Sequence, residues 1–408
     1  MIRSLRTAVT GLKSHQIRMD VVGNNIANVN SIGFKRGRTA FSEVLGQKLF
    51  SANRASGGQS INSSFIGFGV GVAAIDQNWN QGALENTNIA TDMALNGDGF
   101  FVVNNGSRTM LTRAGNFAFD DQGRLVTSAG VNVQGYAVDS DGNVDTSAFR
   151  DVTIDFAVQA PPRVTENVTV AGNLPSDTPE GETVDISTVI YDEQGRAHSV
   201  IVSFTKTANA NEWDYEAKYN GDLSPAPFAT ETGTITFEVD GTLSSPAPIE
   251  PTYDTNYVTS GSTFAIALDG VTQYSGSTTI GVQDQDGFGR GQVIGYYIDS
   301  DGMVALNFSN GEQQALYQLA IASVNNPNGL ENLGENFYGL TSESGDPIYG
   351  RAGQEIQTSV VEGFLEMSNV DLATEFTDMI VAQRGYQASA RVITTSDELL
   401  QETVNLKR

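Results

Sequence analysis

The chain has 408 residues, of which 39% are hydrophobic and 17% are charged. The charged fraction lies below the usual quarter, so neutral polar side chains must cover much of the surface. A net charge of −25 argues against nucleic-acid binding, which requires a basic face. The absence of cysteine and the presence of only two histidines exclude disulfides, thiolate zinc sites and multi-histidine metal sites. No apolar run approaches membrane-spanning length, so we expect no membrane insertion.

The two ends of the chain have opposite charge. Residues 1–38 carry seven Lys/Arg and one acid, whereas residues 365–408 carry four Lys/Arg and seven acids. We prefer a basic N-terminal segment that docks on an acidic partner over an arm that binds phosphate or a membrane. The first residues lack the apolar block of a secretory signal. The protein is therefore expected to stay in the cytoplasm or to leave by a route that needs no cleaved signal.

The N-terminal segment predicts an amphipathic helix followed by a turn. Apolar residues recur at helical spacing at Leu5, Val9, Leu12, Met19, Val22 and Ile26. Asn24, Asn25 and Asn28 then end the helix, because side-chain amides satisfy loose carbonyl groups. Gly33 permits a chain reversal and Phe34 anchors the chain that follows. Taken alone, this pattern is also that of an ordinary helix C-terminus.

The next part of the chain predicts a β domain made of two separate segments. Residues 39–69 include a Gly/Ser-rich stretch and are predicted to be a linker. The segments Gly135–Gly142 and Gly295–Gly302 nearly repeat each other, and each indicates a strand that enters an Asp-Gly hairpin. We therefore predict one inner β domain from residues 70–144 and 286–364.

Residues 145–285 predict an inserted outer domain. Nine of the eleven prolines lie between Pro161 and Pro251. Several segments there alternate apolar and polar residues between turns, which is typical of an antiparallel β sandwich or barrel. The predicted fold class is mainly β with long terminal α-helices and nested, discontinuous domains.

The C-terminal segment predicts one long helix from about residue 370 to 404. Ser368 and Asp371 fit a capping box. An apolar seam of alternating four- and three-residue steps runs through Leu372, Phe376, Met379, Gln383, Tyr386, Ile393 and Leu400. The two terminal helices, residues 1–38 and 365–408, are expected to pair as a coiled coil. We favour contacts of both seams with other copies of the chain over a coiled coil closed within one monomer.

The sequence offers weak support for catalysis or for a bound metal. Asp139–Asp145 resembles a calcium loop, but its glycine stands at the wrong position and a hairpin turn explains it better. No Gly-x-Ser-x-Gly elbow occurs, and His198 lies among alternating strand residues, where we expect a surface histidine. Paired carboxylates for glycoside hydrolysis stay open, because their spacing is spatial. We predict no catalytic residue, no metal, no cofactor and no enzyme.

The most specific stretch is Gly23–Lys35, which reads GNNIANVNSIGFK. Ser368–Leu372, Met379–Gln387 and Ala94–Phe101 accompany it at corresponding places in the chain. Together these segments resemble the axial proteins of the bacterial flagellum, the family of rod, hook and hook-associated subunits. The resemblance covers both ends and the flanking β domain, whereas the insert matches mainly in position and size.

This resemblance implies a structural subunit that self-assembles into a helical tube through its terminal segments. The insert favours the hook, a curved flexible tube that transmits torque from rod to filament as a universal joint. The implied partners are other copies, the distal rod protein, the hook cap protein, the hook–filament junction protein and the flagellar type III export apparatus, with an extracellular location and no cleaved signal. The alternatives are a distal rod-type protein, which lacks the insert, and a secreted β-rich adhesin or glycan hydrolase.

Overall fold

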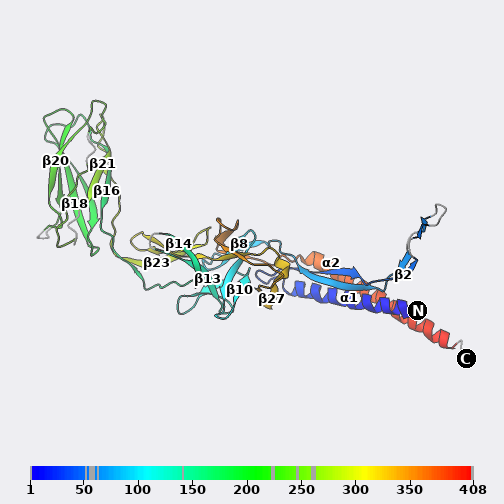
Figure 1. The fold of residues 1–408 in the computed structure, drawn as a ribbon. Helices are drawn as coiled ribbons and strands as arrows, with labels where there is room; N and C mark the ends of the chain where they lie inside the picture. The colour runs from blue at the N-terminus through cyan, green and yellow to red at the C-terminus, as the bar shows by residue number, and fades with distance from the viewer. Residues whose placement is uncertain are drawn as a thin grey trace. The chain divides into compact units, whose positions relative to one another are not determined.

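The computed structural model describes residues 2–50, 53–54, 60–61, 64–139, 142–221, 226–244, 248–258 and 263–405. The fold is mainly β with one long helix at each end of the chain (Figure 1). Two compact units are present. The first unit comprises Met1–Asp155, Tyr297–Ala305 and Ala315–Arg408, and the second comprises Phe156–Tyr296 and Leu306–Gln314.

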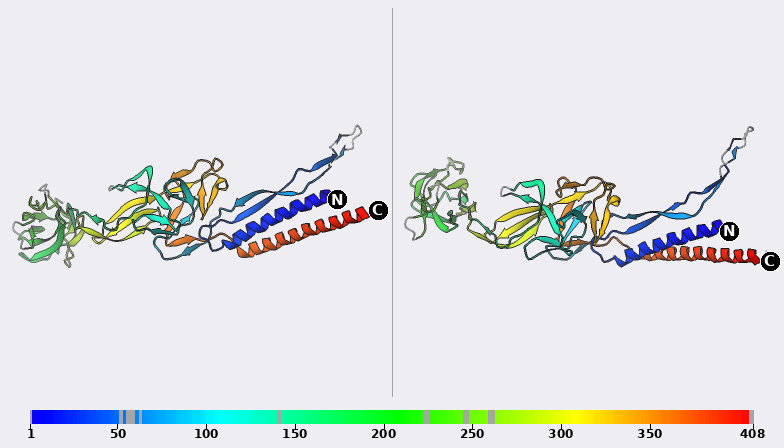
Figure 2. Two further views of the ribbon diagram at one scale, coloured as in Figure 1. Left: turned by 90° about the horizontal axis from the view of Figure 1, so that it is seen from below. Right: turned by 60° about the horizontal axis from the view of Figure 1, so that its bottom comes forward.

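The terminal helices lie side by side in the first unit and run in opposite directions (Figure 2). α1 spans Ile2–Ala27 and α2 spans Leu372–Asn405, close to the predicted ranges. The predicted capping box at Ser368 was wrong. The N-cap is Asp371, whose carboxylate accepts hydrogen bonds from the Ala373 amide at 3.0 Å and the Thr374 hydroxyl at 2.6 Å.

The predicted linker contains an antiparallel ribbon. β1 (Gly37–Glu43) pairs with β6 (Val70–Gln77), and both strands pack along α1. Farther out, β2 (Gln47–Phe50) pairs with β5 (Ser64–Ile66), and β3 (Asn53–Arg54) pairs with β4 (Ser60–Ile61). Residues 51–52, 55–59 and 62–63 of the predicted linker lie outside the described residues. Its Gly and Ser residues obscured the β-branched and aromatic residues that form these strands.

The β domain of the first unit is built around one sheet path, β25-β13-β9-β10-β28-β27. Buried Phe100, Val102, Leu111, Tyr136 and Tyr338 share one of its apolar clusters. The strands on or beside this path are β9 (Phe100–Asn104), β10 (Thr109–Thr112), β11 (Phe117–Phe119), β12 (Leu125–Thr127), β13 (Asn132–Val138), β14 (Val144–Asp151), β25 (Gln313–Leu319), β26 (Ile321–Ser323), β27 (Glu331–Gly334), β28 (Phe337–Gly339) and β29 (Ile348–Gly350).

Two small ladders connect this domain to the C-terminal helix. β8 (Met93–Asn96) pairs with β30 (Ser359–Glu362), and β7 (Leu84–Asn86) pairs with β31 (Phe364–Glu366), six residues before α2 begins. A short 3-10 helix, η1 (Pro327–Gly329), precedes β27. The start of the C-terminal helix is therefore fixed to the strands that follow the ribbon.

The two predicted hairpins occur, but the boundary between the predicted domains lies elsewhere. Gly142 and Gly302 have φ of 81° and 73°, as the Asp-Gly turns require. β23 (Gly291–Ile298) and β24 (Met303–Phe308) flank the second turn. Residue 145, the predicted start of the insert, falls inside β14, which pairs with β13 of the first unit. The second unit instead begins at Phe156.

The second unit contains two sheets that enclose one apolar core around fully buried Trp213, Phe204 and Phe264. The sequence predicts antiparallel pairing throughout this unit, but β16 and β21 pair in parallel. The long chain between these two strands provides the crossover connection that parallel strands need. The sheets comprise β17 (Thr183–Tyr191), β18 (Ala197–Lys206), β19 (Glu212–Tyr219) and β20 (Glu231–Thr236), and β16 (Asn167–Asn173), β21 (Ala265–Thr272) and β22 (Gly281–Gln285); β15 (Gln159–Ala160) pairs with β23.

His198 is buried in this unit, and the expectation of a surface histidine was wrong. Its Nε2 lies 3.0 Å from Oδ2 of Asp192, which is itself buried. Asp192 also accepts the amides of Gln194 and Arg196 in the β17–β18 hairpin. Burial opposes ionisation of Asp192, but the hydrogen bonds from His198 and Arg196 outweigh it and lower the pKa of that carboxyl. His198 therefore stabilises the turn between β17 and β18 through Asp192.

Candidate functional site

The two terminal helices meet through small residues. A Cβ atom placed on Gly11 would lie 3.0 Å from Oγ of Ser389, and one on Gly385 would lie 2.5 Å from the ring of His15. The missing side chains therefore let the helices approach closely. Buried residues of α2 are Glu375, Ala382 and Ser396, a different stripe from the predicted seam. We call this contact the inner seam.

Charged and amide side chains close the inner seam at the end nearest the β domain. Arg18 pairs with Asp378 at 2.8 Å, and Arg36 pairs with Asp378 at 3.1 Å and also with Glu375. Asn25 donates to Glu375 Oε2 at 3.1 Å and to the Gly37 carbonyl at 2.8 Å, and it accepts the Gly37 amide at 2.9 Å. One buried asparagine of the Asn-rich stretch therefore ties α1, α2 and β1 together.

A buried ion cluster lies beside this network. Nζ of Lys35 lies 2.6 Å from Oε1 of Glu366, and Nη1 of Arg113 lies 3.3 Å from Oε2 of the same carboxylate. The side chains of Lys35 and Glu366 are each only 1% exposed. Burial lowers the pKa of both Lys35 and Arg113, and Glu366 opposes that shift. Glu366 also accepts the Gly82 amide at 2.8 Å, so this cluster joins four separate parts of the chain.

Gly33 makes this junction possible. Its φ of 68° lies in the left-handed region, and its amide donates to the Glu366 carbonyl at 2.8 Å. A Cβ atom there would lie 2.7 Å from the Ala114 nitrogen, which is backbone. The predicted chain reversal at Gly33 is confirmed. Asn28 caps the end of α1 by donating to the Asn24 carbonyl at 2.9 Å, as the Asn-rich pattern predicts.

The predicted apolar seams are mostly left outside the inner seam. On each helix the predicted apolar seam lies roughly a quarter-turn around the helix axis from the inner seam. Because the helices are antiparallel, the two predicted seams face the same side of the helix pair. We call this side the outer apolar face. Val9, Asn24, Leu372, Phe376 and Gln383 are exposed; Leu5, Leu12, Met19, Ile26, Asn28, Phe34, Met379, Tyr386, Ile393 and Leu400 are half-buried; and Val22, Asn25 and Gly33 are buried.

Sequence reasoning missed the inner seam and the buried ion cluster. A signal for the seam existed, since Ala382, Ser389 and Ser396 recur at seven-residue intervals. It was overlooked because small and polar residues do not register as an apolar stripe. Nothing local in the sequence pairs Glu366 with Lys35, which lies 331 residues away.

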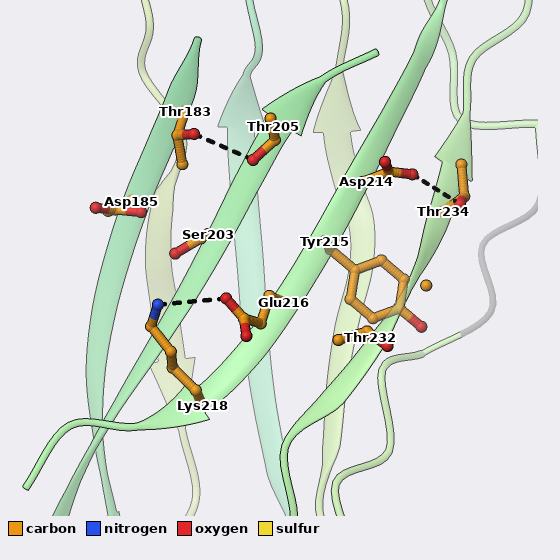
Figure 3. A pocket seen from close by; sticks show the side chains of 11 residues that line it. Thr183, Asp185, Ser203, Thr205, Asp214, Tyr215, Glu216, Lys218, Thr232 and Thr234 are labelled. Carbon is orange, nitrogen blue, oxygen red and sulfur yellow. Dashed lines mark hydrogen bonds and ion pairs between the residues drawn. The ribbon is translucent and has the colours of Figure 1, made fainter. Parts of the chain in front are cut away.

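A polar hollow of about 620 Å³ lies on the solvent face of the four-stranded sheet in the second unit (Figure 3). Its side chains bond to one another. Thr234 donates to Asp214 at 2.9 Å, and Lys218 donates to Glu216 at 3.3 Å. Two of the three carboxylates that line the hollow, those of Asp214 and Glu216, are therefore held by neighbouring surface side chains.

The Asp-Gly turns bind their own backbone. Asp299 accepts the amides of Asp301 and Met303 at 2.9 and 2.8 Å, and Asp139 accepts the Asn143 amide at 2.7 Å. These are the bonds of a polar turn residue, as the hairpin interpretation predicts. Among the described residues no cluster of three or more acids or histidines is placed to hold a metal ion.

The helix pair should lose stability as the pH falls below about 6.5. Burial and the nearby Arg18 lower the pKa of His15 from 6.5. Between the pKa of His15 in the folded chain and its higher pKa in the unfolded chain, only the unfolded chain binds the proton. Acid therefore favours unfolding in this pH range. Far-UV circular dichroism melts at about pH 7.5 and 5.5 would measure this. H15Q should reduce the difference in stability between the two pH values. If that difference is unchanged in H15Q, groups other than His15 cause it.

Four family models match the chain. They are Flagella basal body rod protein over residues 5–35, Flagellar hook protein FlgE/F/G D1 domain over 94–173, Flagellar basal body protein FlaE D2 domain over 164–288, and Flagellar basal body rod FlgEFG protein C-terminal over 361–406. The first and last models cover the two helices of the inner seam. All four describe the class of structural axial proteins of the bacterial flagellum.

Similar proteins are found over the full length of the chain. The flagellar hook protein FlgE of Borreliella burgdorferi is 37% identical, with 100% of both chains covered, and that of Salmonella typhimurium is 32% identical, with 99% of this chain and 100% of the relative covered. The crystal structure of the Helicobacter pylori flagellar hook protein FlgE2 covers 69% of this chain and 100% of its own, with a TM-score of 0.54 at 15% identity, and shows likeness of fold.

The chain belongs to the flagellar hook protein family. It is a structural subunit of the hook, and the family is not one of enzymes. The alternatives of a distal rod-type protein and a secreted adhesin are not favoured. No helix in the described part of the chain combines the length and apolar character needed to cross a membrane.

Proposed function

We propose that this subunit polymerises into a curved, flexible tube that transmits motor torque from rod to filament, and that its terminal helices form the subunit contacts. The single observation that carries this proposal is the outer apolar face. Phe376 is 52% exposed and Leu372 39% exposed in the lone chain, although they continue a seam expected to be covered. Apolar surface of this kind marks an interaction site.

The inner seam explains why the outer apolar face is available. The helices already contact each other through Gly11, His15, Gly385 and Ser389, so their closest approach requires no large apolar side chain. Pairing of the helices as a coiled coil within one subunit and contact with other subunits are therefore compatible. The 18 residues predicted as an assembly interface divide accordingly: Val22, Asn25 and Gly33 stabilise the subunit, and the exposed apolar members contact neighbours.

The domain arrangement that we propose follows the family. Residues 1–38 and 365–408 form the assembly domain, an inner β domain carries the second unit as an insertion, and the insertion is the outer part of the tube wall. The unit limits of Phe156 and Tyr296 support an insertion about ten residues later than 145–285. Partners would be the distal rod, hook cap and hook–filament junction proteins, after export by the flagellar type III apparatus without a cleaved signal.

A matched pair of substitutions tests the assembly face. Phe376 is 52% exposed and Val381 49% exposed on α2, but only Phe376 lies on the outer apolar face, because Val381 lies about 140° around the helix from it. F376D should abolish tube formation by the purified chain, because a carboxylate would have to be desolvated in the contact. V381D should leave assembly nearly unchanged. Sedimentation and electron microscopy measure the outcome, with circular dichroism to verify folding.

Equal assembly by both variants would contradict the assignment of the face. Failure of the unaltered chain to form any ordered polymer, under conditions in which a related hook protein does, would contradict the proposed function itself.

A further inference from the structure

A groove of about 690 Å³ lies on the side of the helix pair opposite the outer apolar face. It is bounded by α1, α2 and the ribbon. Ala8, Val70 and Val392 line it with apolar groups, and Gly69 keeps the ribbon close to α1. Arg3 stands at its end and, in the described part of the chain, forms no ion pair.

The end of α2 projects beyond α1 (Figures 1 and 2). Gly11 is level with Ser389 and His15 with Gly385, so Ile2 is about level with Glu398. The last turns of α2, to Asn405, therefore have no α1 beside them. This projecting end lies next to the groove.

The projecting end carries both apolar and acidic side chains. Leu399 is 52% exposed and Val404 69% exposed. Glu402 is exposed, and within the described residues it forms no ion pair. Leu399 and Glu402 are three residues apart and so share one face of the helix. That face matches the groove in character, with an apolar group beside a charge opposite to that of Arg3.

The chain cannot satisfy this match internally. Leu399 lies two turns beyond Val392 on the same straight helix, so it cannot enter the groove that Val392 lines. Glu402 lies six residues beyond Ser396, a buried residue of the inner seam, and so about 120° around α2 from it, pointing away from α1. Leu399 and Glu402 of the same chain therefore do not fill the groove, and a second molecule can supply both groups.

We propose that the groove of each subunit receives the projecting end of α2 from a second copy, with Leu399 against the apolar wall and Glu402 facing Arg3. This inference rests on the proposed function and specifies one of its contacts. The two surfaces differ, so each copy can both give and receive, and the contact repeats instead of closing as a dimer. The opposite charges fix the orientation of the helix end in the groove.

Charge reversal in purified full-length chains tests this pairing. R3E and E402R should each raise the critical concentration for polymerisation about fivefold, and the double variant R3E/E402R should return it to within about twofold of the unaltered chain. K13E, an equivalent reversal on an exposed part of α1 outside the groove, is the control for a general charge effect. Higher salt should reduce the effect of each single reversal.

The apolar part of the contact has its own test. L399D should prevent polymerisation, whereas Q387D, at another exposed position of α2, should not. If the unaltered chain polymerises but R3E and E402R behave like K13E, or the double variant shows no recovery, the groove pairing is wrong and the proposed function stands. If the unaltered chain does not polymerise, the proposed function fails first.

Discussion

Replacement of Glu366 by alanine should lower the free energy of unfolding of the first unit by about 3–5 kcal/mol. Glu366 faces two buried cations, Lys35 at 2.6 Å and Arg113 at 3.3 Å. Its removal would leave both charges in a low-dielectric interior without their counterion, and would also release the Gly82 amide. Urea unfolding followed by far-UV circular dichroism measures the loss.

The matched control is E355A in the same unit. Glu355 pairs with Arg351, but its side chain is 43% exposed, so solvent screens the pair. Its removal should cost less than about 1 kcal/mol. Similar losses for the two variants would mean that the buried cluster contributes no more than a surface ion pair.

Replacement of Gly33 by alanine should cost at least about 3 kcal/mol, the second largest effect that we expect. A side chain is disfavoured at φ of 68°, and the new Cβ atom would also lie 2.7 Å from the Ala114 nitrogen and 2.8 Å from the Arg113 carbonyl carbon. Backbone atoms cannot rotate away as a side chain can. The variant should therefore open the junction beside the buried ion cluster.

Gly106 separates the two causes. Its φ is 86°, and a Cβ atom there would meet nothing within 4 Å. G106A should cost about 1 kcal/mol, the price of the backbone conformation alone. Thermal and urea unfolding of both variants would give the comparison, and equal losses would show that the close approach at Gly33 is relieved by small shifts.

The sequence predicts the helices well because their periodicity is long and uninterrupted. The 372–405 helix lies within two residues of the predicted range, since four heptads of regular spacing exceed what chance produces. The ribbon at 37–77 was not predicted, because strands of two to eight residues with Gly and Ser between them leave a weak pattern. The parallel pairing of β16 with β21 depends on residues nearly 100 positions apart, which local reasoning does not relate.

The sequence predicts only part of the candidate site, because local patterns do not identify the partner of a side chain. The apolar residues of both helices were identified, but their partner was not, because a periodic stripe does not tell which molecule covers it. The inner seam escaped notice since glycine, alanine and serine carry no hydropathy signal. Asn25 and Gly33 were predicted together with Asn24 and Asn28 as residues of the assembly interface, and their hydrogen bonds within the subunit were not foreseen. Lys35 was quoted only as the last residue of the Asn-rich stretch.

The buried ion cluster also governs when a subunit can become complete. Lys35 lies near the beginning of the chain and Glu366 near its end, 331 residues apart. Until the last tenth of the chain is present, Lys35 and Arg113 lack the carboxylate of Glu366 and Gly33 lacks the Glu366 carbonyl that accepts its amide. An unfinished polypeptide therefore cannot close this junction, and only a whole molecule presents both helices in register to the growing end of a polymer.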